Sequence, residues 1–416
     1  MKKIAVLLTI LLLTSATLVA GLYIGGYLTP GSDTAPIVTP IPEETPVPSE
    51  EPASPEGSVP ADGQGTASGQ VPEEPEQIGM PREYSCAYER LTGKEQEVYL
   101  QICSALKDFR EVKVSTTDRD LLEKVYSYCM ADHPEIFYVG GFTFTDRQVG
   151  GVSTEFTFRG NYLFTKEETQ ALREEIELAS DSILSGIPDP SSDYAAAKYL
   201  YETIVRMTEY DPDAQYNQNI VSVFTSGRSV CNGYSKALQY LLQRAGIEAM
   251  TVSGQSRGSS HAWVVARLDG DFYHIDVTWG DASFSGEDAG TAAPGDWINY
   301  DYLCVTTGDI SATHTASDEV PVPECSADAD NYYVREGRYV TVFNEELLRE
   351  IFRTPQQVTQ DGGSVYSLRA SHEAYEDLTW ELVENSGIYR FIDTPGQVHY
   401  TSDPDMRTMT FFVSGG

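Results

Sequence analysis

Basic residues are scarce in this 416-residue chain. It has 28 Lys and Arg residues against 63 Asp and Glu, which gives a formal net charge of −35. The acidity is not confined to one segment, because residues 29–80 hold ten acids and no Lys or Arg while residues 81–416 are strongly acidic as well. A surface of this charge repels the phosphate backbone of nucleic acids. We therefore expect no nucleic-acid partner.

The sequence also lacks paired cysteines of the Cys-x-x-Cys kind. Its six cysteines are scattered, so zinc ligation is not expected, and we predict neither a metal nor a cofactor. With 41% hydrophobic residues, a chain of this length can build cores without disulfides, although export would permit them. If Cys231 has to remain a thiol, the other five cannot all pair; they are Cys86, Cys103, Cys129, Cys304 and Cys325.

One long uncharged run stands at the N-terminus, from Ile4 to Leu28, behind Lys2 and Lys3. A cleaved signal peptide usually has an apolar core of about 7–15 residues and a small-residue cleavage site, which Leu18-Val19-Ala20 matches poorly. The run is long enough to span a bilayer of about 30 Å with its positive end inside. We predict that residues 1–28 are a membrane anchor, with a cleaved signal peptide as the alternative. The rest would then lie outside the cell membrane, or be secreted.

Composition and periodicity divide the remaining residues into four segments. Residues 29–80 are rich in Pro, Glu, Ser, Gly and Thr, and are predicted to be a disordered linker. Residues 81–190 are predicted to form an N-terminal α/β domain, 191–320 the catalytic domain and 321–416 a small C-terminal α+β domain. The elements expected in the flanking domains are helices at 91–109, 121–130, 166–185 and 345–352, and strands at 136–139, 142–144, 154–158, 332–334, 339–343 and 409–413.

Cys231 stands at the start of a predicted helix. The apolar residues after it have the spacing of an amphipathic helix that faces a core: Tyr234, Ala237, Leu238, Leu241 and Leu242. Gly246 follows the last turn, where a helix-ending glycine is expected. The unpaired N–H groups and the dipole at a helix start stabilise a thiolate, and the Cys231 backbone N–H can face a developing oxyanion. A lone free cysteine is more often a small core residue, so Cys231 needs partners before it indicates catalysis.

Those partners lie in two strand-like runs that flank Asp269-Gly270, a dipeptide that strongly favours a β-hairpin. A two-residue turn would make His261 and Asp276 diagonal neighbours on one sheet face, about 7–8 Å apart at the backbone and within side-chain reach. A three-residue turn would move Asp276 to the other face. A thiol nucleophile, an imidazole base and a carboxylate that orients the imidazole form a set that can carry out acyl transfer.

The three motifs resemble the transglutaminase-like superfamily, which has a papain-like fold. The matching stretch is about residues 195–315, and its motifs are Val230-Cys231-Asn232-Gly233-Tyr234-Ser235, His261-Ala262-Trp263 and Asp276-Val277-Thr278-Trp279. The resemblance implies an α+β core in which the helix that starts at Cys231 packs on an antiparallel sheet carrying His261 and Asp276. It also implies that these three residues are nucleophile, base and orienter.

Flanking segments extend the resemblance, and two positions depart from it. Thr208-Glu209-Tyr210-Asp211 resembles the Tyr-Asp that ends the preceding helix, and Tyr300-Asp301-Tyr302 with His314 resembles the segment after the aspartate. Many bacterial relatives have Asn where this chain has Val264, and often His where it has Tyr201. We expect neither departure to touch the triad, although both could alter the pocket.

Four further residues are candidates for the wall or rim of the site. Trp263 and Trp279 either pack in the core or exclude water from the site, and Tyr210 is a candidate second oxyanion donor. Residues 254–260 are small, polar and Gly-punctuated, so we predict an exposed, mobile loop that holds Arg257 at the rim to attract acidic peptides. A plain hairpin connection is the alternative.

The function expected from these residues is amide-bond chemistry on a protein or cell-wall peptide outside the membrane. The acyl-enzyme would pass to water, as in a peptidase or amidase, or to an amine, as in a cross-linking enzyme. A non-catalytic binding or scaffold module of the same fold is the alternative, against which the intact triad argues. The sequence does not indicate substrate identity, oligomeric state or any effect of calcium.

Overall fold

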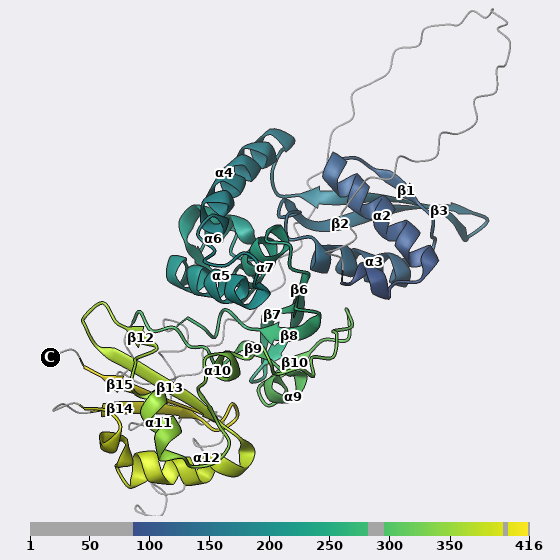
Figure 1. Cartoon of the computed structure of the whole chain (residues 1–416). Helices are drawn as coiled ribbons and strands as arrows, with labels where there is room; N and C mark the ends of the chain where they lie inside the picture. Colours follow the sequence, from purple (N-terminus) through teal and green to yellow (C-terminus); the bar gives the residue numbers. More distant parts are fainter. Residues whose placement is uncertain (1–85, 282–294, 394–397, 415–416) are drawn as a thin grey trace, which may run out of the picture. The chain divides into compact units, whose positions relative to one another are not determined.

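The computed structural model describes residues 86–281, 295–393 and 398–414. In these residues the strands form three larger sheets, with helices beside them (Figure 1). The first sheet has the strand order β1-β3-β2 and lies beside α2 and α3. A capping box of Thr92 and Glu95 starts α2, and a disulfide between Cys103 and Cys129 joins α2 to α3. The elements are η2 (Tyr88–Arg90), α2 (Gly93–Asp108), β1 (Val112–Val114), α3 (Arg119–Asp132), β2 (Val139–Val149) and β3 (Val152–Tyr162).

A group of helices follows, and its last member begins at Cys231 (Figure 1). A short parallel pair, β4 with β5, brings the residues after α5 beside the residues that lead into α7. The helix α7 buries the apolar face expected from its sequence, including Tyr234, Leu238 and Leu241. The elements are α4 (Lys166–Leu184), α5 (Asp193–Met207), β4 (Glu209–Tyr210), α6 (Ile220–Ser226), β5 (Arg228–Ser229) and α7 (Cys231–Arg244).

The second sheet has the order β10-β6-β7-β8-β9. Asp269 and Gly270 form the β7–β8 turn with φ values of 50° and 99°, so Leu268 pairs with Asp271 and Val264 with Ile275. The register predicted for a two-residue turn is therefore confirmed. The elements are β6 (Ala249–Ser256), β7 (Ser259–Leu268), β8 (Asp271–Ile275), β9 (Leu303–Val305), α9 (Thr307–Ile310) and β10 (His314–Ala316).

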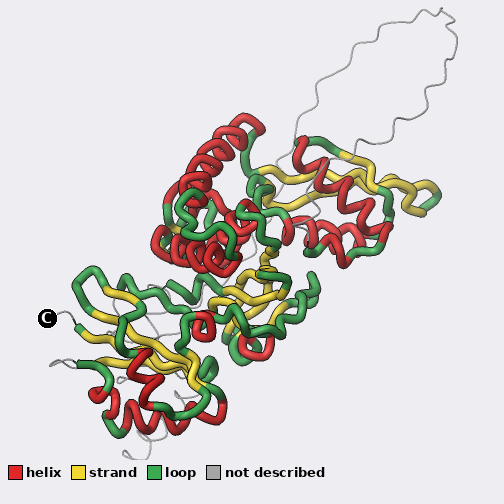
Figure 2. Tube along the Cα trace, in the orientation of Figure 1, coloured by secondary structure: helices red, strands yellow, loops and turns green. Residues whose placement is uncertain are grey.

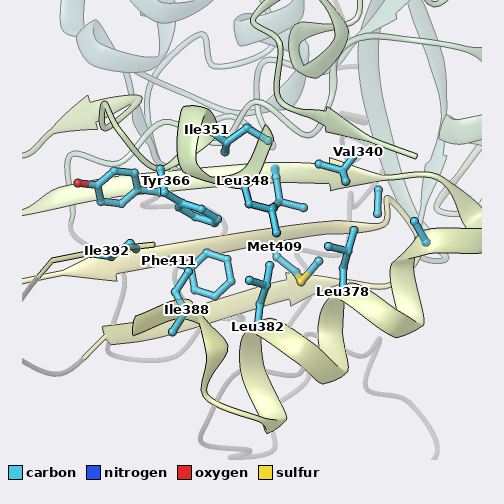
Figure 3. Packing of buried hydrophobic residues seen from close by; sticks show 14 residues of the cluster. Val340, Leu348, Ile351, Tyr366, Leu378, Leu382, Ile388, Ile392, Met409 and Phe411 are labelled. Carbon is cyan, nitrogen blue, oxygen red and sulfur yellow. The ribbon is translucent and has the colours of Figure 1, made fainter. Parts of the chain in front are cut away.

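The third sheet lies in the C-terminal region, has the order β11-β13-β15-β14, and pairs β12 with β13. Helices pack against it (Figure 2). Leu378 and Leu382 point toward Met409 and Phe411 in an apolar core (Figure 3). The elements are α10 (Tyr332–Arg335), β11 (Tyr339–Val340), α11 (Glu345–Ile351), β12 (Gln357–Val358), β13 (Ser364–Ala370), α12 (His372–Thr379), η3 (Trp380–Glu384), η4 (Gly387–Arg390), β14 (Val398–Asp403) and β15 (Thr408–Val413).

Three predicted strands differ from the structure. Residues 136–138 form a turn held by the Ile136 N–H on the His133 carbonyl, and β2 begins only at Val139. Residues 332–334 belong to the helix α10, because the Asn331 side chain caps its first turn by accepting from the Tyr333 N–H. The strand predicted at 339–343 is limited to the two residues of β11.

Within the described residues, no helix is long and apolar enough to cross a membrane. The predicted anchor or signal peptide at 1–28 and the predicted linker at 29–80 lie outside those residues.

Candidate active site

Cys231 is the first residue of α7 and is partly exposed. Val230, in extended conformation, precedes it as the N-cap, and the Ser235 hydroxyl ties the helix to β7 by donating to the Ala262 carbonyl at 2.9 Å. Gly233 permits close packing of this first turn: a Cβ there would lie 2.9 Å from the Asn217 carbonyl oxygen and would clash with the Ser229 hydroxyl. The predicted helix start at Cys231 is thus confirmed.

His261 lies on β7, and Asp276 comes one residue after the end of β8. His261 Nε2 is 2.7 Å from Asp276 Oδ2. The Asp276 backbone is fixed on both sides, because its N–H donates to the Tyr302 carbonyl at 3.0 Å and its carbonyl accepts from the Tyr201 hydroxyl at 3.4 Å. The expectation that Tyr201 does not touch the triad was therefore wrong.

Asp276 is completely buried, yet four donors surround its carboxylate. Oδ1 accepts from the backbone N–H groups of Thr278 at 3.0 Å and Trp279 at 3.2 Å. Oδ2 is shared between His261 and His314, whose Nε2 lies 2.9 Å away. Burial opposes a charge here, but the two histidines outweigh it and hold the pKa of Asp276 well below its usual range.

His261 connects this carboxylate to Cys231. Its side chain is hydrogen-bonded to Asp276 and interacts with the Cys231 side chain. Since Nε2 faces Asp276, Nδ1 is the nitrogen left for the thiol. Burial disfavours a charged imidazole, but Asp276 and Cys231 outweigh burial and raise the pKa of His261 to about 10. The three side chains thus form a connected relay from sulfur to carboxylate.

His314 was noticed in the sequence only as part of a resembling segment, without a role. It starts β10, pairs with Ser256 of β6, and is buried. Its Nδ1 lies 2.7 Å from the Thr313 hydroxyl, so both ring nitrogens have partners. The sequence could not predict its contact with Asp276, because 38 residues separate them and the sheet order β10-β6-β7-β8 is not written in local periodicity.

The tryptophans line this cluster. The buried Trp263 ring stacks along His261, with centroids 6.3 Å apart, and its indole N–H donates to His274 Nδ1 at 3.1 Å. Trp279 packs against Tyr302 at 5.6 Å. Both rings belong to one apolar core cluster, so the reading that they pack in the core is confirmed.

Tyr210 lies on β4 beside the start of α7. Burial raises the pKa of Tyr210 above its usual value, and the charges of Cys231 and Asp276 raise it further. Its hydroxyl therefore stays protonated at neutral pH and keeps a proton to donate.

Residues 254–260 do not form the predicted loop but the plain hairpin connection that was its alternative, with Gly258, Ser259 and Ser260 exposed. β6 and β7 continue to a two-residue turn at Arg257 and Gly258, with φ values of 49° and 85°. The Arg257 guanidinium is 3.5 Å from Asp403 and 3.8 Å from Asp405, and it lies over the Trp279 ring at 5.3 Å. Arg257 thus touches one wall of the site, but two carboxylates already engage its charge.

Two groups among the described residues bring metal-ligating atoms within 4.8 Å of one another. In His261, Asp276 and His314 these atoms are hydrogen-bonded together. In the second group, two of the three members are the cysteines Cys103 and Cys129, which form the disulfide. Ordinary hydrogen bonding and covalent chemistry thus account for both arrangements.

A cysteine at a helix start, with a histidine and an aspartate on the adjoining antiparallel sheet, defines a papain-like cysteine-enzyme core. Residues 181–277, which include all three side chains, match the family model of the transglutaminase-like superfamily. The chain therefore contains a transglutaminase-like domain, and members of that superfamily are generally cysteine enzymes.

Individual relatives are distant. The chain is 23% identical over 136 residues to the kyphoscoliosis peptidase of Mus musculus, a match that covers 28% of this chain and 21% of that protein. Among solved structures, a TGase has a TM-score of 0.24 at 16% identity, covering 41% of this chain and 50% of its own. The periplasmic domain of TgpA from Pseudomonas aeruginosa has a TM-score of 0.22 at 16% identity, covering 33% and 59%.

Proposed function

We propose that the chain is a cysteine enzyme that breaks amide bonds in peptides through a thioester on Cys231. The observation that carries the proposal is the position of His261, whose Nε2 is 2.7 Å from Asp276 Oδ2 and whose ring interacts with the Cys231 side chain at the start of α7. An imidazole held between a buried carboxylate and a helix-start thiol is the arrangement that acyl transfer requires.

The reaction begins when the Cys231 sulfur, as thiolate, attacks the carbonyl carbon of the amide. The oxygen that becomes negative lies against the N–H groups at the start of α7, and the Tyr210 hydroxyl is the candidate second donor. His261 then gives its proton to the leaving amine, which departs as the thioester forms. Asp276 keeps the imidazole oriented and stabilises its charged form throughout.

The thioester is resolved by a second nucleophile. Water gives a free acid, and a primary amine gives a new amide; in both cases His261 takes the proton of the incoming group. The partly exposed thiol leaves one side of the site open to that nucleophile.

The substrate we propose is a protein or cell-wall peptide outside the membrane. The support comes from the sequence: the uncharged run from Ile4 to Leu28 behind two lysines fits a membrane anchor or an export signal, and an exported acyl-transfer enzyme meets such peptides.

Two assays on the full chain test the proposal. A thiol-reactive peptide probe should label Cys231 first among the cysteines at mildly acidic pH, and labelling should disappear in Cys231→Ala but persist in Cys325→Ala, which removes a buried thiol. Glutamine-containing peptides are then incubated with and without a fluorescent primary amine, and mass spectrometry identifies a new acid or a new amide. Equal labelling of all thiols, with no product on any peptide, would favour the non-catalytic module.

A further inference from the structure

A second histidine, His314, bonds Asp276 in addition to the three residues Cys231, His261 and Asp276. Asp276 Oδ2 lies 2.7 Å from His261 Nε2 and 2.9 Å from His314 Nε2, so two imidazoles share one oxygen. The other oxygen is already occupied by two backbone N–H groups. His314 therefore competes directly with His261 for the carboxylate oxygen that orients the base.

The surroundings of His314 determine its form. Its ring is buried among the rings of Trp263, Tyr302 and Trp279, with the T-shaped Trp263 centroid 5.0 Å away. The Thr313 hydroxyl lies 2.7 Å from Nδ1 and 3.3 Å from the Ile310 carbonyl oxygen. When the hydroxyl donates to the nearer acceptor, Nδ1, the ring proton is on Nε2, facing Asp276. In this tautomer His314 is an N–H donor to the carboxylate.

The N–H donated by His314 to Asp276 also affects His261, the other histidine that bonds the same carboxylate oxygen. A carboxylate oxygen that accepts a second N–H bond is a weaker base toward the first donor. His261 already binds its proton strongly, and a general acid that holds its proton too tightly delivers it slowly to the leaving amine.

From this arrangement, and resting on the proposed function, we infer that His314 is a positioning residue. It shares Asp276 Oδ2 with His261, fixes the plane of the carboxylate, and limits how strongly Asp276 holds the proton on His261. Thr313 supports this role by fixing the tautomer of His314. The working unit is then a Cys231-His261-Asp276-His314 relay.

His314→Leu and His314→Gln separate this role from simple packing. Leucine fills much of the ring volume but cannot donate, while the glutamine amide can place an N–H near the position of Nε2. In full chain carrying Cys231→Ala, side-chain ¹H–¹⁵N spectra titrate His261 without any substrate. We expect the pKa of His261 to rise in His314→Leu and to return toward its starting value in His314→Gln.

In the active chain, His314→Leu should lower kcat by up to about tenfold, because one pKa unit is a factor of ten in proton-donating strength. The value of KM should not change, since His314 is buried behind Asp276. The alkaline limb of the rate profile should move to higher pH. His274→Leu is the matched control. His274 is also a buried imidazole of this sheet, but it bonds Trp263 and Thr307, so its substitution should leave the pKa of His261 unchanged.

An unchanged or lowered pKa of His261 in His314→Leu would overturn the inference, even if the enzyme turned peptides over as proposed. The predicted rise without turnover on any peptide would support the inference and count against the proposed substrate class. If His314→Leu does not fold, Thr313→Val takes its place. That variant frees His314 to adopt the other tautomer and should move the His261 pKa the same way by a smaller amount.

Discussion

The catalytic cluster and the C-terminal core are both buried, but different forces hold them. Around Asp276 the chain buries a carboxylate and two imidazoles, which satisfy one another at 2.7 and 2.9 Å. The C-terminal core consists of apolar side chains between a sheet and its helices, such as Leu378, Met409 and Phe411 (Figure 3). Polar burial of the first kind is stable only when every partner is present, while an apolar core tolerates conservative changes.

The two regions should therefore respond differently to substitution. In the catalytic cluster, a substitution of the partly exposed Cys231 should affect activity more than stability. A substitution of the buried Asp276 should lower both activity and stability. In the C-terminal core, they should affect stability alone.

The largest effect is expected from Cys231→Ala. Removing the nucleophile of a catalytic unit costs roughly a millionfold in kcat in a well-studied serine enzyme, and we expect a loss of at least about a thousandfold here. Stability should change by less than about 1 kcal/mol, because the side chain is partly exposed. Product formation and urea denaturation measure the two quantities; a large loss of stability would mean that Cys231 is a packing residue.

Phe411→Ala tests the other region. The ring is 1% exposed and packs against Phe352, so we expect a loss of about 3–5 kcal/mol in the free energy of unfolding. Labelling of Cys231 should be unchanged at temperatures where the variant is folded. Val413→Ala, on the same strand but only half-buried, is the control and should cost much less. Altered labelling in folded Phe411→Ala would show that the regions are coupled through the core.

Two turns of the catalytic sheet were not equally predictable from the sequence. Asp269-Gly270 predicted the β7–β8 register because both residues tolerate positive φ, and the apolar spacing after Cys231 predicted α7. Arg257-Gly258 makes the same kind of turn, with φ values of 49° and 85°, but arginine is not a turn signal and the segment was predicted to be a loop.

Long-range contacts explain most of the remaining misses. The His314–Asp276 bond depends on which strand neighbours β6, which local patterns do not specify. Tyr332-Tyr333-Val334 has the composition of a strand, but the Asn331 cap and burial around Asp301 make it a helical turn; the Tyr333 hydroxyl donates to Asp301 at 2.5 Å.

An intermediate effect is expected from pH on the catalytic cluster. The folded-state pKa of His261, about 10, exceeds its unfolded value of about 6.5, so its contribution to stability is fully present below about pH 6.5 and is lost as the pH rises through 10. For Asp276 the folded pKa is lowered, so its contribution is present above about pH 4 and is lost as the pH falls further.

The difference in unfolding free energy between the wild type and His261→Gln should therefore shrink from pH 6 to pH 10, by an amount on the order of 2 kcal/mol. Urea denaturation at four or five pH values measures it, and His399→Gln, at an exposed position of β14, serves as the surface control. If this difference in unfolding free energy grew with pH, it would contradict the upward shift that Asp276 and Cys231 give to the pKa of His261.

The smallest effect is expected where the two regions meet, at Arg257. The side chain of this residue is 22% exposed and pairs with Asp403, which is 1% exposed. Burial raises the pKa of Asp403, and Arg257 opposes that rise. When Arg257→Ala removes the partner, Asp403 can take up a proton instead of remaining a buried charge, so we expect a loss of only about 1 kcal/mol at neutral pH, smaller at acidic pH. A double-mutant cycle with Asp403→Asn isolates the pair.

Because the two carboxylates already engage Arg257, kcat and KM should stay within about twofold of the wild type. A selective rise in KM for acidic peptides would restore Arg257 as a substrate contact and would make the junction of the two regions part of the active site.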